Sequence, residues 1–287
     1  MTLRQVGAPK PSLSRSIRDA VNAGKLTLPP MPPVAAKVLR LLREDYNGPV
    51  GPLVVLLSSD PALTTAILRV ANSAIFGGLG EVSDLRIAIA RLGVREVTAI
   101  VTMVAHKANF VSDDPEKQAI LHALWDHSIV TAQGARRIGT ERGVDGSDAF
   151  LAGLLHDTGK LLLFRAFDRL LAEGQGQKLT AAARDELMET LHPELGHHVL
   201  SDWRIPESAC HVALHHHDAE PPVDDRLLLC VQAANSISRK IGAHTHPSPE
   251  LNLLEVRAIQ RLELTDAVLS ELMSELVGDL EHLRQLL

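Results

Sequence analysis

A short apolar run that ends abruptly in ionisable side chains constrains this chain more than any other feature. Residues 151–155 are apolar or glycine, and His156, Asp157 and Lys160 follow before residues 161–164 become apolar again. Because burying a carboxylate without a partner is costly, Asp157 must face a cation, a group of hydrogen-bond donors or a water-filled cleft. The fold must therefore bring compensating groups to this point.

The pairing of an imidazole with a carboxylate favours a metal cation as that partner. Neutral histidine and ionised aspartate are ligands used by Zn, Fe and Mn. Adjacent helical residues point about 100° apart, so His156 and Asp157 can reach one ion together only at a helix end, which Thr158 and Gly159 would supply. The alternative is an interior histidine held by a neighbouring aspartate.

Other histidines lie in similar surroundings. The chain contains 14 of them, and His127, His192 and the three consecutive residues 215–217 each lie at the edge of an apolar helical pattern. This recurrence favours a shared metal site over an isolated His-Asp pair. His244 and His246 follow a glycine in a proline-containing loop, where we expect solvent-exposed side chains.

Helical periodicity, without the dipeptides that mark β-hairpins, predicts an all-α fold. In the first half we expect helices that begin near Ser12 or Ser14, Pro33, Val50, Asp60, Asp84 and Val94. In the second half we expect helices near residues 117–139, 147–157, 159–172, 180–190, 192–203, 206–216 and 224–241, then a final pair whose last helix is capped at Thr265. This division places His192 in the first turn of its helix.

Composition excludes several classes of protein. No apolar run among the 287 residues reaches the roughly 18 needed to cross a bilayer, and the start lacks the apolar core of a signal peptide, so we expect a cytoplasmic protein without membrane contact. Cys210 and Cys230 are isolated in apolar segments, which suggests reduced thiols. A net charge of −6 and 3% aromatic residues argue against a broad nucleic-acid surface.

The order of the histidine motifs resembles the HD superfamily of metal-dependent phosphohydrolases, whose signature is H…HD…H…HH…D. Further motifs make the chain similar to the HDOD family, a branch of that superfamily, from about residue 26 to residue 241; they lie at residues 28–32, 60–63, 69–74, 87–93, 124–128 and 203–207. The resemblance implies an N-terminal tail and helix (1–25), an N-terminal helical lobe (26–110), an HD-like lobe (111–243) and a C-terminal helical extension (244–287).

The resemblance also implies a set of ligands for divalent Fe, Mn or Zn. One metal would be held by His127, His156, Asp157 and the closing aspartate. A second would share Asp157 with His192 and two of the three consecutive histidines, for which we favour His216 and His217 over His215. If the protein is a hydrolase, Lys160 would face the substrate phosphate and act with Asp157 in catalysis.

One position departs from the superfamily pattern. Asn235 stands where the closing aspartate is expected. Replacing a carboxylate with an amide removes one negative charge and one strong oxygen ligand, so the first site should bind a dication more weakly.

HDOD proteins are regarded as largely non-catalytic members of bacterial signalling systems. The resemblance therefore implies a regulatory protein that acts through an unidentified protein partner or a nucleotide second messenger. The alternative is a metal-dependent phosphohydrolase or phosphodiesterase acting on a nucleotide or cyclic dinucleotide. A homodimer could form through Leu276, Leu280 and Leu283, but these are equally consistent with core positions.

Overall fold

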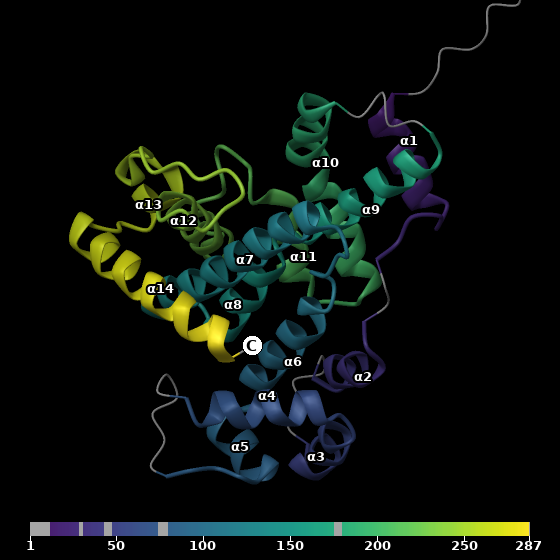
Figure 1. The fold of residues 1–287 in the computed structure, drawn as a ribbon. Helices are drawn as coiled ribbons and strands as arrows, with labels where there is room; N and C mark the ends of the chain where they lie inside the picture. The colour runs from purple at the N-terminus through teal and green to yellow at the C-terminus, as the bar shows by residue number, and fades with distance from the viewer. Residues whose placement is uncertain (1–11, 29–30, 43–47, 74–79, 175–179, 287) are drawn as a thin grey trace, which may run out of the picture.

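The computed structural model consists of packed α-helices, which confirms the predicted all-α class (Figure 1). It describes residues 12–28, 31–42, 48–73, 80–174 and 180–286, with side chains of the last helix described as far as Leu280, and no strand occurs within these ranges. The first half contains α1 (Leu13–Asn22), α2 (Pro33–Leu42), α3 (Val50–Ser58), α4 (Pro61–Ala71), α5 (Leu85–Leu92) and α6 (Val94–Lys107).

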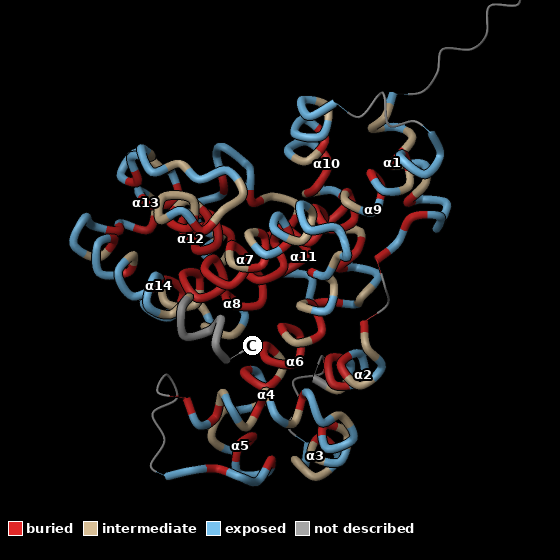
Figure 2. Tube along the Cα trace, viewed as in Figure 1, coloured by how far each residue is buried: buried red, intermediate tan, exposed pale blue. Residues whose placement is uncertain are grey.

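The second half contains longer helices around the main core. These are α7 (Pro115–Glu141), α8 (Gly146–Leu155), α9 (Thr158–Ala172), α10 (Ala181–Asp202), α11 (Glu207–His215) and α12 (Arg226–Lys240), followed by a 3₁₀ turn (Leu253–Glu255), α13 (Arg257–Arg261) and α14 (Asp266–Leu286). Burial is most continuous along α7, α8 and α12, at the centre of the molecule (Figure 2). The proposed division into lobes and extensions remains a prediction.

Local sequence signals explain where several of the helices begin. The carboxylate of Asp60 accepts hydrogen bonds from the backbone N–H groups of Ala62 and Leu63, at 3.0 and 3.1 Å, and Asp84 caps α5 in the same way. Such caps satisfy N–H groups that have no partner within the helix. The predicted starts of α4 and α5 are thereby confirmed.

Close contact between α7 and α8 depends on a small residue. A side-chain carbon on Gly153 would lie 2.9 Å from the Cα of Ala132, which is shorter than carbon atoms tolerate. The glycine therefore allows the two backbones to meet, and it brings the C-terminal end of α8 close to the middle of α7. This packing places His156 beside His127.

The predicted break between residues 190 and 192 is wrong. Instead, α10 continues from Ala181 to Asp202 with Pro193 inside it. A proline removes one backbone hydrogen bond, but burial of α10 against α9 compensates for that loss. The contact is so close that a side chain on Gly159 would lie 2.0 Å from the carbonyl oxygen of His192. His192 therefore lies in mid-helix and not in a first turn.

The C-terminal helix α14 packs on α7. Leu276 is buried, and its side chain lies against Gly134 of α7, so it belongs to the core; Leu280 is partly buried, and the side chain of Leu283 lies outside the described residues. In the described ranges, no single helix has the length and apolar character to cross a membrane. Only α3 and α4 taken together meet that test, and they are bent by 119° where they join.

Candidate metal centre

Six side chains that the sequence singled out meet in the interior of the molecule. They come from four places in the chain: α7, the junction of α8 with α9, α10, and the residues that follow α11. We call them the His/Asp cluster; its members are His127, His156, Asp157, His192, His216 and His217. All are buried except His217, which is the most accessible member.

Asp157 divides the cluster into two groups that could each hold a metal ion. Its Oδ2 lies 3.4 Å from Nε2 of His127 and 3.5 Å from Nε2 of His156. Its Oδ1 lies 3.3 Å from Nε2 of His192 and 3.5 Å from Nε2 of His216. The single carboxylate thus presents one oxygen to each group, which is the arrangement expected of a ligand shared by two metals.

Backbone carbonyls determine which ring nitrogen carries the proton in the four buried imidazoles. In each ring Nδ1 lies within hydrogen-bonding distance of a carbonyl oxygen, which can only accept. The pairs are His127 with Ala243 (3.0 Å), His156 with Gly153 (2.7 Å), His216 with Ala213 (2.9 Å) and His192 with Met188. Nδ1 therefore carries the proton, and Nε2 is left with a lone pair directed into the cluster.

The resulting Nε2 atoms lie as close together as ligands of one cation do. Nε2 of His127 is 3.2 Å from that of His156, and Nε2 of His192 is 3.0 Å from that of His216 and 3.1 Å from that of His217. Two lone pairs repel each other at this separation, whereas two nitrogens bound to one tetrahedral Zn²⁺ lie about 3.3 Å apart. The spacing fits shared metal ligands.

The protonation states also suit metal binding. Burial lowers the pKa of His127, lowers the pKa values of His156 and His192 well below the ordinary histidine value, and lowers that of His217 to about 4. Burial alone would raise the pKa of Asp157, but the ammonium of Lys160 and the surrounding imidazoles hold it well below its usual range. Near neutral pH these four imidazoles are therefore neutral and Asp157 is ionised, which are the ligand forms.

Lys160 is directed at the cluster and not at an open cavity. Its Nζ donates to Oδ2 of Asp157 at 2.6 Å, and the residue is only 6% exposed. The ammonium thus neutralises the shared carboxylate. Contact of Lys160 with a substrate phosphate remains a prediction.

Asn235 has an unsatisfied oxygen next to this region. Its Oδ1 is buried and has no hydrogen-bond partner among the residues that the structure describes. One turn further along α12, the hydroxyl of Ser238 lies 2.9 Å from Nδ1 of His127, so Asn235 and Ser238 lie on the helix face that adjoins the cluster. An unpartnered buried oxygen fits a neutral fourth ligand for the group that contains His127 and His156.

The three consecutive histidines have different roles. Nδ1 of His215 lies 2.9 Å from Oδ2 of Asp218, outside the cluster, whereas His216 and His217 belong to it. The backbone explains this difference, because α11 ends at His215 and the chain then turns inward.

His244 lies in the loop that follows α12, as expected, but its side chain is only partly exposed and faces the cluster. Its ring packs edge-to-face on His127 with centroids 4.5 Å apart, and burial lowers its pKa to about 3. Gly242, with a φ of 87°, reverses the chain after α12 and returns His244 to the cluster. In the sequence, Gly242 indicated that the chain turns after α12, but it could not show that the turn leads back to the cluster. His246 is exposed, as expected.

Comparison with proteins of known sequence identifies a relative. It is a protein of uncharacterised function from Treponema pallidum (strain Nichols), 26% identical over 268 residues, which cover 88% of this chain and 50% of the relative. The chain thus spans about half the length of that protein.

Solved structures share the fold. An HDOD domain protein of unknown function from Geobacter sulfurreducens matches with a TM-score of 0.73 at 22% identity, covering 96% of this chain and 97% of that one. A protein from Shewanella amazonensis SB2B whose name suggests a metal-dependent phosphohydrolase matches with a TM-score of 0.70 at 20% identity, covering 92% and 98%. A protein from Marinobacter aquaeolei VT8 whose name suggests signal transduction matches with a TM-score of 0.64 at 18% identity, covering 96% and 65%.

The family model of the HDOD domain matches residues 28–219, which is more than half of the chain and contains the whole His/Asp cluster. The helical fold agrees with the HDOD structure from Geobacter sulfurreducens. This chain therefore belongs to the HDOD domain family.

Proposed function

We propose that this chain is a signalling protein whose His/Asp cluster binds a divalent Fe, Mn or Zn ion and uses it for regulation without turnover. The observation that carries this proposal is the inward orientation of the Nε2 lone pairs around Asp157, which is unfavourable unless a cation lies among them. The bound metal would fix the relative positions of α7, α8, α10 and α11, and so make the surface offered to a protein or nucleotide partner depend on metal.

Three features favour regulation over catalysis. Lys160, the residue expected on a substrate phosphate, is buried and bonded to Asp157. Asn235 supplies an amide where a carboxylate would strengthen one metal group. His127, His156 and His192 are each 0% exposed, so solvent reaches the cluster chiefly past His217.

A metal-dependent phosphohydrolase is the second candidate, because Asp157 presents one oxygen to each of two histidine groups. Two bound dications would supply Lewis acidity toward a phosphoryl group and neutralise its charge. In that role His217, the accessible member, would adjoin the substrate. The fold similarity to the Shewanella protein is compatible with either candidate, since one fold can serve several functions.

Turnover assays on metal-loaded protein distinguish the two candidates. We would measure hydrolysis of cyclic dinucleotides, nucleoside phosphates and a generic phosphodiester by the wild type and by Asp157→Ala. The regulatory proposal predicts equal background rates for both proteins. Hydrolysis by the wild type that Asp157→Ala abolishes would establish the phosphohydrolase instead.

The Asn235→Asp variant tests whether residue 235 closes the metal site. Restoring the carboxylate should raise the affinity of the group containing His127 and His156 by at least about tenfold, because an anionic oxygen is a stronger ligand than an amide. Metal titration of the wild type and the variant in parallel provides the measurement. Equal affinities would show that Asn235 does not contact the metal.

A further inference from the structure

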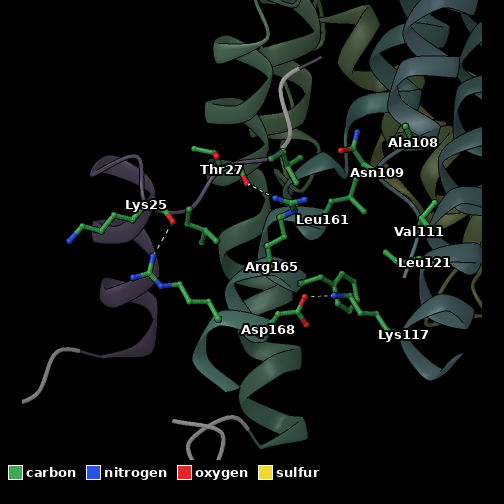
Figure 3. Close-up of a pocket in the computed structure, with 14 residues that line it drawn as sticks. Lys25, Thr27, Ala108, Asn109, Val111, Lys117, Leu121, Leu161, Arg165 and Asp168 are labelled. Carbon is green, nitrogen blue, oxygen red and sulfur yellow. Dashed lines mark hydrogen bonds and ion pairs between the residues drawn. The ribbon is translucent and has the colours of Figure 1, made fainter. Parts of the chain in front are cut away.

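A second place suited to a ligand lies on α9, separate from the His/Asp cluster. It is a cavity of about 550 Å³ between residues 25–28, the segment that joins α6 to α7, the first turns of α7, and α9 (Figure 3). We call it the basic cavity; the residues that matter for its chemistry are Lys117, Arg165, Asp168, Arg169, Asn109 and Phe164. A volume of roughly 300–1,000 Å³ is typical of small-molecule sites.

The charge of the basic cavity is opposite to that of the chain. The protein carries a formal charge of −6, yet four basic residues line this cavity together with one carboxylate, Asp168; they are Lys25, Lys117, Arg165 and Arg169. Lys117 forms an ion pair with Asp168 across the cavity wall (Figure 3). Arg169 is likewise paired with Glu173, at 2.7 Å, which leaves the guanidinium of Arg165 without a carboxylate partner among the ion pairs of the described residues, so the cavity favours an anion.

Arg165 is the residue best placed to bind such an anion. Its Nη1 donates to the backbone oxygen of Thr27 at 3.2 Å, which fixes the guanidinium at the centre of the cavity wall (Figure 3). A guanidinium carries five N–H donors in one plane and can bind two phosphate oxygens at once. Arg169 is more fully occupied, because it bonds to the oxygen of Lys25 and to Glu173.

The rest of the lining suits an apolar or aromatic group beside the anion. Leu121, Leu161 and Phe164 border the cavity, and Asn109 adds an amide. Lys117 approaches the Phe164 ring at 5.8 Å, so its ammonium lies between the apolar part and the acidic residue Asp168. A cavity lined by cations, an aromatic ring and leucine side chains matches a nucleoside monophosphate in size and chemistry.

We propose that the basic cavity binds a small phosphorylated ligand of mononucleotide size, with its phosphate on Arg165 and its apolar part against Phe164 and Leu161. The ligand would bridge the connector at residues 25–28 and α9. Since α9 begins beside Asp157 and carries Lys160, occupancy would bear directly on the helix that supports the metal centre. The cavity would thus be a regulatory input distinct from that centre.

Calorimetric titration of the full chain with adenosine monophosphate, guanosine monophosphate, pyrophosphate and inorganic phosphate at constant ionic strength tests this proposal. We expect a nucleoside monophosphate to bind the wild type, and Arg165→Gln to weaken binding by at least about tenfold because charge-assisted hydrogen bonds are lost. Arg86→Gln, which changes an exposed arginine of α5, is the matched control and should bind as the wild type does.

Two further variants decide where the ligand binds. Asp157→Asn disturbs the metal centre but leaves every contact of the basic cavity in place, so the variant should still bind the nucleoside monophosphate, with only the change in affinity that coupling through α9 gives. Failure of the metal proposal would therefore not remove this binding. Lys117→Gln leaves the hydrogen bond between Arg165 and Thr27 intact, so it provides a second test if Arg165→Gln proves unstable. It should also weaken binding. Absence of binding at millimolar concentration, or binding that survives Arg165→Gln and Lys117→Gln but is lost in Asp157→Asn, would overturn the proposal.

Discussion

The N-terminal helices α2–α6 and the helices around the His/Asp cluster both contain buried histidine, but they treat it differently. His106 of α6 is 1% exposed and packs edge-to-face against Phe110 and Trp203, with ring centroids 5.0 and 6.0 Å away. His127 is 0% exposed and has a carbonyl on Nδ1 and other imidazoles near Nε2. Burial is common to both, so the shared direction of several Nε2 atoms is what marks a metal centre.

Two polar side chains of the N-terminal helices, Asn72 and Arg91, form hydrogen bonds with backbone groups and not with one another. The side chain of Asn72 donates to the oxygen of Val82 and accepts from its N–H, at 2.8 and 2.7 Å. Arg91 donates to the backbone oxygens of Ala71 and Gly80. These hydrogen bonds hold Gly80 and Val82 in place. In the His/Asp cluster, by contrast, the backbone carbonyls bind Nδ1 of each buried histidine and so orient its Nε2.

Among variants that compare the two regions, Gly159→Ala should cause the largest loss of stability, because Gly159 lies where α9 meets α10 beside the cluster. The added carbon would lie 2.0 Å from the oxygen of His192, so α9 and α10 would have to separate, at a cost of at least about 3 kcal/mol in the free energy of unfolding. Gly51→Ala is the matched control, because no atom lies within 4 Å of its new carbon in α3, and it should change stability by less than about 1 kcal/mol. Urea unfolding measures both, and equal stabilities would disprove the close contact.

A smaller effect is expected from acid on His106. Burial lowers the pKa of His106 from 6.5 to about 3. Below pH 6.5 the unfolded chain therefore binds a proton at this residue more readily than the folded chain does. The free energy of unfolding consequently falls as the pH decreases from 6.5 toward 3. Between pH 7 and pH 5 the wild type should lose about 2 kcal/mol more than His106→Phe, which cannot titrate. Urea unfolding at both pH values provides the comparison. The same pH dependence in both proteins would show that His106 is not buried as a neutral ring.

The smallest effect is expected for Asn72→Ala, which removes both hydrogen bonds to Val82. Stability should fall by about 1–2 kcal/mol, because two backbone groups lose their partner. The metal content should be unchanged, since this asparagine serves only the loop. A drop in metal content per folded chain would contradict the separation of structural and metal-binding polar groups.

The sequence predicted the parts of the molecule that depend on local rules. Helix caps at Asp60 and Asp84 and the all-α class follow from short-range patterns, and the family resemblance identified the histidines that meet at Asp157. The continuity of α10 through Pro193 was not predictable, because it depends on packing against Gly159, far away in sequence. The inward turn of His244 likewise depends on tertiary packing that periodicity does not contain.

Elemental analysis of the purified protein tests the central claim most directly. The wild type and Asp157→Ala would be produced together in medium containing Fe, Mn and Zn, purified without chelators, and compared per folded chain. We predict at least about one dication per wild-type chain and a loss of most of it in Asp157→Ala, because the variant removes the ligand shared by both groups. A wild type without bound metal, or an equal metal content in both proteins, would contradict the account.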